Sequence, residues 1–181
     1  MNGKENVNEP HSELNSEVEA EAPRLEQGVP APAEPVSTTL EEALNKYGIA
    51  LEPYQIEMLK DYCQLLWDWN EKLNLTRHTD FDRFVSRDIL DTVQLADLIE
   101  TGMEVLDFGS GGGVPGIPLS IIRPDLQVSL CESVSKKTVA LDDMITKLSL
   151  PVPVINARVE DLLNDLNYDV IMSYIPTKVC N

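Results

Sequence analysis

A glycine-rich run follows directly on the predicted strand Glu104–Phe108 and is the part of the sequence best suited to holding a ligand. Glycines between a strand and a helix allow a tight turn and let a ligand approach the backbone, and the helix that follows offers free N–H groups. The spacing fits two patterns. Gly111, Gly113 and Gly116 match the G-x-G-x-x-G fingerprint of dinucleotide sites, whereas a turn that starts where the strand ends begins at Gly109.

Carboxylates lie on both sides of this run. Asp107 precedes Gly109 by two residues, and the resulting Asp-x-Gly-x-Gly-x-Gly pattern resembles motif I of the S-adenosylmethionine-dependent methyltransferases. Glu132 ends the next predicted strand, where a carboxylate can accept both ribose hydroxyls of a nucleoside. That contact serves NAD and S-adenosylmethionine alike. Glu160, after the third predicted strand, is a further candidate at the same edge of the sheet.

The elements that must position these residues alternate along the chain. Predicted strands cover 104–108, 127–132, 152–156 and 169–172, and predicted helices cover 117–122, 135–148 and 159–164. Strands alternating with helices are typical of an α/β fold with a parallel sheet. Ligands bind such a sheet at the carboxyl ends of its strands, which is where the glycines and the acids lie.

Three more helices are predicted before the sheet. Thr39 and Glu42 form a capping-box pattern for a helix over 40–47. Pro53 starts a longer helix that ends near Asn74, and a third helix covers 80–99 with Thr79 as its cap. Apolar residues at helical spacing are expected to face the core, Leu98 and Val139 among them.

Residues 1–38 differ in composition from the remainder. They hold eight glutamates against Lys4 and Arg24, with a late cluster of prolines, and show no apolar periodicity. We interpret them as a disordered acidic tail, followed by a helical segment over 39–100 and a Rossmann-like domain over 101–181. The whole chain carries 14 Lys+Arg against 31 Asp+Glu, a net charge of −17, which argues against a protein that coats nucleic acid.

Composition also excludes several classes of protein. No run of about 18 apolar residues could span a membrane, and no basic-then-apolar leader is visible. Cys63, Cys131 and Cys180 are widely spaced, which fits neither a disulfide framework nor a zinc site, so no metal site is predicted. A reduced, cytoplasmic protein is the simplest interpretation.

Five segments carry a family resemblance. They are Trp69–Thr76, Arg87–Thr92, Leu106–Leu119, Glu132–Lys137 and Arg158–Glu160. In this order and spacing they resemble ribosomal RNA small subunit methyltransferase G, also called glucose-inhibited division protein B. The resemblance covers about residues 40–172, and the Val-Pro-Gly-Ile-Pro sequence after the glycines is more specific than the glycine spacing itself.

The resemblance implies methyl transfer from S-adenosylmethionine to N7 of a guanine in small-subunit (16S) rRNA, on an incomplete Rossmann-like sheet. Guanine N7 already presents a lone pair, so the protein has mainly to align donor and acceptor, and no catalytic residue is predicted. Four cofactor contacts are carried over by position, namely Gly109, Val114, Val159 and Glu160. The turn and strand-end considerations above add Gly111, Gly113 and Glu132.

Candidate RNA contacts form two groups, Arg77, Arg83 and Arg87 in one and Lys136 with Lys137 in the other. Basic clusters of this kind bind phosphates, although a solvated helix face explains the arginines equally well. The expected partner is small-subunit rRNA or the ribosomal subunit. The chain is expected to be a monomer and to have no membrane partner.

Two positions depart from the family pattern. Asp88 stands where the family usually has His, and Tyr174 stands where the family has an active-site Arg. The chain ends at Asn181 after four predicted strands, whereas this class has about seven, so the resemblance predicts a truncated domain with part of its substrate side missing. Three hypotheses remain open, namely a guanine-N7 rRNA methyltransferase, an NAD(P)-dependent oxidoreductase and a non-catalytic remnant.

Overall fold

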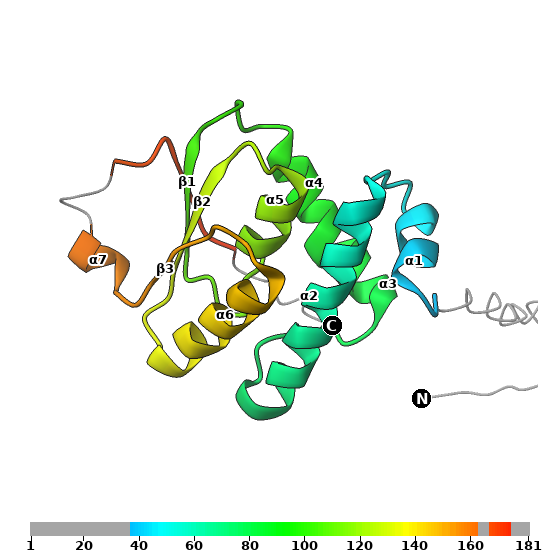
Figure 1. The fold of residues 1–181 in the computed structure, drawn as a ribbon, viewed down its shortest axis with the longest axis horizontal. Coiled ribbons are helices and arrows are strands. Elements are labelled where there is room, and N and C mark those ends of the chain that lie inside the picture. Colours follow the sequence, from blue (N-terminus) through cyan, green and yellow to red (C-terminus); the bar gives the residue numbers. More distant parts are fainter. Residues whose placement is uncertain (1–36, 163–166, 175–181) are drawn as a thin grey trace, which may run out of the picture. The chain divides into compact units, whose positions relative to one another are not determined.

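Four parallel strands form the sheet of the structure, a computed structural model that describes residues 37–162 and 167–174 (Figure 1). The strands are β1 (Glu104–Phe108), β2 (Gln127–Cys131), β3 (Val154–Ile155) and β4 (Val170–Met172), in the order β3-β2-β1-β4. In the central register Val105 of β1 pairs with Val128 of β2 and with Val170 of β4. The predicted α/β fold with a parallel sheet is confirmed.

β1 and β2 are buried over nearly their whole length, which suits strands that are covered on both faces. The two outer strands, β3 and β4, form the edges of the sheet. β3 is only two residues long, and β4 exposes 49% of Ile171.

The helices that follow the strands lie close to their predicted positions. They are α5 (Gly116–Ile122), α6 (Ser135–Leu148) and α7 (Val159–Leu162). Residues 163 and 164 of the predicted helix over 159–164 lie outside the described residues. Val139 was wrongly placed in the core, since it is 59% exposed, because the buried face of α6 runs through Leu141, Met144 and Ile145 instead.

The helical segment before the sheet contains α1 (Leu40–Lys46), α2 (Pro53–Leu73), α3 (Phe81–Arg83), the π-helix η1 (Phe84–Ile89) and α4 (Leu90–Ala96). Figure 1 shows α2 beyond α5 and α6, on the side away from the strands. Its buried side chains, Leu59, Tyr62, Cys63 and Leu66, join the same core as the sheet. Gln55 strengthens this packing, because its amide donates to the backbone oxygens of Ile121 and Ile122 at the open end of α5.

The predicted helix over 80–99 is interrupted and shorter than expected. Asp80 caps it instead of Thr79, since an Asp80 carboxylate oxygen accepts from the Arg83 N–H at 2.8 Å. The chain continues as the π-helix η1 and then as α4, which ends at Ala96. Leu98 therefore lies in a turn and is 81% exposed, so its predicted place in the core was wrong.

The predicted cap of α1 is half confirmed. Thr39 accepts from the Glu42 N–H at 3.2 Å, as a capping box requires. The Glu42 carboxylate, however, accepts from the backbone N–H and hydroxyl of Thr38, one residue earlier. These hydrogen bonds hold the pKa of Glu42 below its usual value.

Candidate functional site

The glycine loop, residues 109–115, leaves β1 in a conformation that suits glycine. Gly109, Gly111 and Gly113 have φ angles of +73°, +58° and +99°, in the left-handed region that other residues rarely enter. Gly109 follows Phe108, the last residue of β1, so the turn begins at the first glycine of the methyltransferase-like pattern. The predicted end of this strand at Phe108, from which the turn was expected to begin at Gly109, is confirmed.

The loop is fastened to the carboxyl end of β2. The Cys131 carbonyl accepts from the Gly109 and Ser110 N–H groups at 2.8 and 3.2 Å. One carboxylate oxygen of Glu132 accepts from the Gly111 N–H at 3.0 Å, and the other accepts from the Val134 N–H at 2.8 Å. The structure therefore brings together Glu132 and the glycines that the sequence predicted, although Glu132 is only 5% exposed.

Asp107 lies beneath the loop and is fully buried. One carboxylate oxygen accepts from the N–H of Gly116 at 3.1 Å, whereas the other has no hydrogen-bond partner among the described residues. Burial raises the pKa of this carboxyl to about 7, against the hydrogen bond from Gly116, which lowers it. A Cβ on Gly116 would meet the Asp107 carboxylate at 2.6 Å, so the glycine is required for this contact.

The helical segment supports the loop from the other side. Tyr62 of α2 is fully buried, and its hydroxyl donates to the Gly112 carbonyl at 2.9 Å. A Cβ on Gly112 would lie 3.0 Å from Leu66 and 3.3 Å from the Leu75 carbonyl, so the loop rests closely on this segment. Sequence reasoning missed Tyr62, because nothing in helical spacing reveals where its hydroxyl points.

Asn156 is a second residue that sequence reasoning missed. It follows β3, and its amide nitrogen donates to the Glu132 carbonyl at 2.8 Å and to the Thr138 hydroxyl at 2.9 Å. Its amide oxygen accepts from the Ser135 hydroxyl. Asn156 thus joins the ends of β2 and β3 to the first turn of α6. A polar residue at the end of the predicted strand over 152–156 was the available signal.

The remaining predicted cofactor residues lie around this edge. Val114 is half-buried in the loop, and its peptide bond to Pro115 is cis. Val159 and Glu160 begin α7, after β3; the Glu160 side chain is exposed, and Val159 is described by its backbone alone. Neither Val159 nor Glu160 contacts the glycine loop through a hydrogen bond in the described parts of the chain.

The candidate RNA contacts fall on two parts of the structure. Arg77, Arg83 and Arg87 are exposed on the loop after α2, on α3 and on η1. Arg83 forms an ion pair with Asp80 at 3.5 Å. Lys136 is exposed and Lys137 half-buried in the first turn of α6.

The family model described as rRNA small subunit methyltransferase G matches residues 55–174. The chain belongs to this family. It is 51% identical over 138 residues to ribosomal RNA small subunit methyltransferase G of Rhodopirellula baltica, covering 76% of this chain and 60% of the relative. The enzyme of the same name from Chromobacterium violaceum is 42% identical over 135 residues, covering 74% and 65%.

The chain therefore spans about three fifths of the length of the family members that it matches. At the two positions that depart from the family pattern, the structure shows paired side chains. Asp88 is buried beside His78, and Tyr174 donates to Asp91. The charge at Asp88 thus faces a histidine partner.

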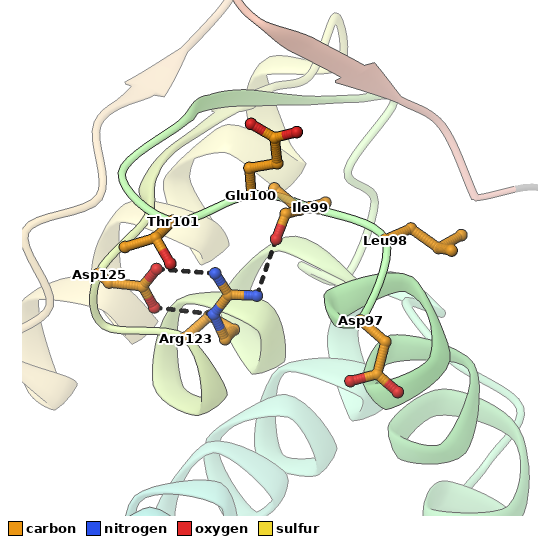
Figure 2. A pocket seen from close by; sticks show the side chains of 7 residues that line it. All are labelled: Asp97, Leu98, Ile99, Glu100, Thr101, Arg123 and Asp125. Carbon is orange, nitrogen blue, oxygen red and sulfur yellow. Dashed lines mark hydrogen bonds and ion pairs between the residues drawn. The ribbon is translucent and has the colours of Figure 1, made fainter.

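A hollow lined by described residues lies elsewhere, before the amino ends of β1 and β2 (Figure 2). It measures about 560 Å³ and is lined by Asp97, Leu98, Ile99, Glu100, Thr101, Arg123 and Asp125. Arg123 is already engaged there, since it donates to the Ala96 and Ile99 carbonyls and pairs with Asp125 at 2.7 Å. This pairing lowers the pKa of Asp125 to about 2. The hollow lies next to the end of α4, at the opposite edge of the sheet from the glycine loop.

No helix in the described parts of the chain is long and apolar enough to cross a membrane. Within residues 37–162 and 167–174, no three His, Cys, Asp or Glu side chains gather as metal ligands.

Proposed function

We propose that this chain binds S-adenosylmethionine at the carboxyl ends of β1, β2 and β3 and methylates N7 of a guanine in small-subunit rRNA. One observation carries the proposal. A loop with three positive-φ glycines is tied to the strand-end carboxylate of Glu132 in a member of the methyltransferase G family. Both relatives named above are, by name, small-subunit rRNA methyltransferases.

The residues present fit such a cofactor. Each carboxylate oxygen of Glu132 accepts one backbone N–H, and an ionised carboxylate has about four acceptor sites, so it retains capacity for ribose hydroxyls. When bound, S-adenosylmethionine supplies a methyl group on a positively charged sulfonium. The residues that we assign to the cofactor are Gly109, Gly111, Gly113, Val114, Glu132, Val159 and Glu160.

The chain's own contribution is mainly one of position. Guanine N7 attacks through an existing lone pair, so no side chain has to remove a proton first. Gly109 and Gly111 are held by β2, and Gly112 is held by Tyr62, so the loop is ordered before a ligand arrives. Arg77, Arg83, Arg87, Lys136 and Lys137 are the basic residues that we assign to RNA phosphates.

Calorimetry separates this function from its alternatives. The full chain should bind S-adenosylmethionine and show no comparable affinity for NAD, whereas a preference for NAD would favour a dinucleotide-dependent oxidoreductase. Incubation with unmethylated small subunits and labelled S-adenosylmethionine should then yield 7-methylguanine after digestion. Cofactor binding without this product would identify a non-catalytic remnant.

A ligand pair tests the role of Glu132. If its carboxylate binds the ribose, the chain should prefer adenosine to 2′,3′-dideoxyadenosine, and Glu132→Gln should lose most of that preference, about 1–3 kcal/mol. Glu132 also supports the loop through Gly111 and Val134. A variant that weakens both ligands equally would therefore assign Glu132 to loop support and remove it from ribose binding.

A further inference from the structure

Two hydrogen-bonded pairs lie beside the carboxyl end of the sheet and take no part in the cofactor site described above. His78 Nδ1 lies 2.9 and 3.0 Å from the two carboxylate oxygens of Asp88. The Tyr174 hydroxyl donates to an Asp91 oxygen at 3.2 Å. Asp88 and Asp91 come from η1 and α4, whereas Tyr174 follows β4 by two residues. The second pair therefore joins the helical segment to the end of β4.

The strand order places the second pair at the point where ligands meet such sheets. In the order β3-β2-β1-β4 the chain adds strands on one side of β1 and then changes to the other side. The crevice of an open parallel sheet lies at this reversal, between the ends of β1 and β4. A Cβ built on Gly109 would be 3.8 Å from the Ser173 hydroxyl, so these two ends approach closely. Tyr174 is the next residue.

The charges of the two pairs also interact with each other. Burial raises the pKa of Tyr174 to about 12, and the carboxylates of Asp91 and Asp88 act in the same direction. Burial likewise raises the pKa of Asp88, against the hydrogen bond from His78. Arg87, exposed on η1, is the nearby positive charge that opposes the effect on Tyr174.

His78 is held from several directions but keeps one edge in solvent. Its backbone carbonyl accepts from Trp67 Nε1 at 2.9 Å, and its N–H donates to the Thr76 hydroxyl at 3.0 Å. Its side chain is 23% exposed, whereas that of Asp88 is 4% exposed. Asp88 occupies Nδ1, so Nε2 is the remaining ring nitrogen, and no hydrogen bond joins it to any described residue. A buried carboxylate that orients a partly exposed imidazole leaves Nε2 ready for a ligand.

We infer that His78 and Tyr174 bind the purine base of the nucleotide to be methylated, with Asp88 and Asp91 as positioning residues. His78 Nε2 forms a hydrogen bond with an edge of the base, and the Tyr174 ring contacts its face, as aromatic side chains do with unstacked bases. The inference rests on the proposed function, because it places the acceptor beside the cofactor loop. It assigns to η1 and the 74–80 loop a role in substrate binding.

The composition of the chain makes a direct test possible. It contains two histidines, His78 and His11, so a sample labelled with ¹³C at histidine Cε1 gives two ring signals. His78→Gln identifies which signal is which, and His11 supplies the internal reference. With S-adenosylhomocysteine at saturation, addition of guanosine 5′-monophosphate should shift the His78 signal until it saturates and leave the His11 signal in place.

A second measurement separates binding from folding. Tyr174→Ala should weaken the nucleotide about tenfold or more while the affinity for S-adenosylhomocysteine stays the same, and Tyr174→Phe should retain most of the ring contact. Tyr54→Ala is the matched control, because Tyr54 is an exposed tyrosine at the start of α2.

The outcomes that contradict the inference are distinct. If S-adenosylhomocysteine binds but the His78 signal does not move, or moves together with the His11 signal, the base-binding role is wrong, while the cofactor binding that the proposed function requires is retained. If S-adenosylhomocysteine does not bind at all, the proposed function fails and this inference fails with it.

Discussion

Replacement of Asp107 by asparagine should change how the stability of the protein depends on pH. The carboxyl is fully buried, and one of its oxygens has no hydrogen-bond partner in the described residues. Burial raises its pKa to about 7, from a usual value of 3.8. Asparagine has nearly the same shape, can accept from the Gly116 N–H in the same way and carries no charge at any pH.

The sign and the size of the effect follow from the two pKa values. Between them the folded chain holds a proton that the unfolded chain has lost, so stability falls as the pH rises. The contribution is fully present below the unfolded pKa and is lost as the pH rises through about 7. At about 1.4 kcal/mol for each pKa unit the whole loss is at most about 4 kcal/mol, and about 2–3 kcal/mol of it falls between about pH 5 and pH 8.

Urea unfolding followed by the fluorescence of Trp67 and Trp69 measures this difference. The free energy of unfolding of Asp107→Asn, taken relative to the natural chain, should rise by about 2–3 kcal/mol from about pH 5 to pH 8. Asp142→Asn is the control, since Asp142 is an exposed aspartate on α6 that makes no hydrogen bond or ion pair with the described residues. A relative stability of Asp107→Asn that stays constant with pH would refute the reasoning.

Two other substitutions test the support of the glycine loop. Tyr62→Phe removes only the hydroxyl that donates to Gly112, so it should lower the free energy of unfolding by about 1–2 kcal/mol in urea titration; no loss would mean that this bond is immaterial. Gly116→Ala places a Cβ against the side chains of Leu130 and Asp107 and should cost about 3 kcal/mol or more by the same measurement. Gly102→Ala is its control for backbone strain without steric overlap, because φ there is +80° while a Cβ meets nothing within 4 Å, and equal costs for the two variants would contradict the packing explanation.

Local signals in the sequence located most of the elements. The limits of α2 follow from Pro53 and from Asn74, which ends the helix with a φ of +48°. Both residues restrict the backbone near themselves, so their effect does not depend on distant contacts. Alternating apolar runs and helical periods likewise identified the parallel sheet. The interruption at η1 and the early end of α4 at Ala96 have no such signal, because packing against the remainder of the core decides them.

Some features of the candidate site likewise follow from the sequence, whereas others depend on the tertiary structure. By itself the sequence determined the glycine turn, the strand-end acids and the family, since each depends on residue types at short spacing. Only the tertiary structure decided that Glu132 holds Gly111, that Tyr62 supports Gly112, and that His78 faces Asp88. The partners in these contacts are 21, 50 and 10 residues apart. Directions of side chains across such separations are set by how the helices pack on the sheet, and a linear pattern does not contain them.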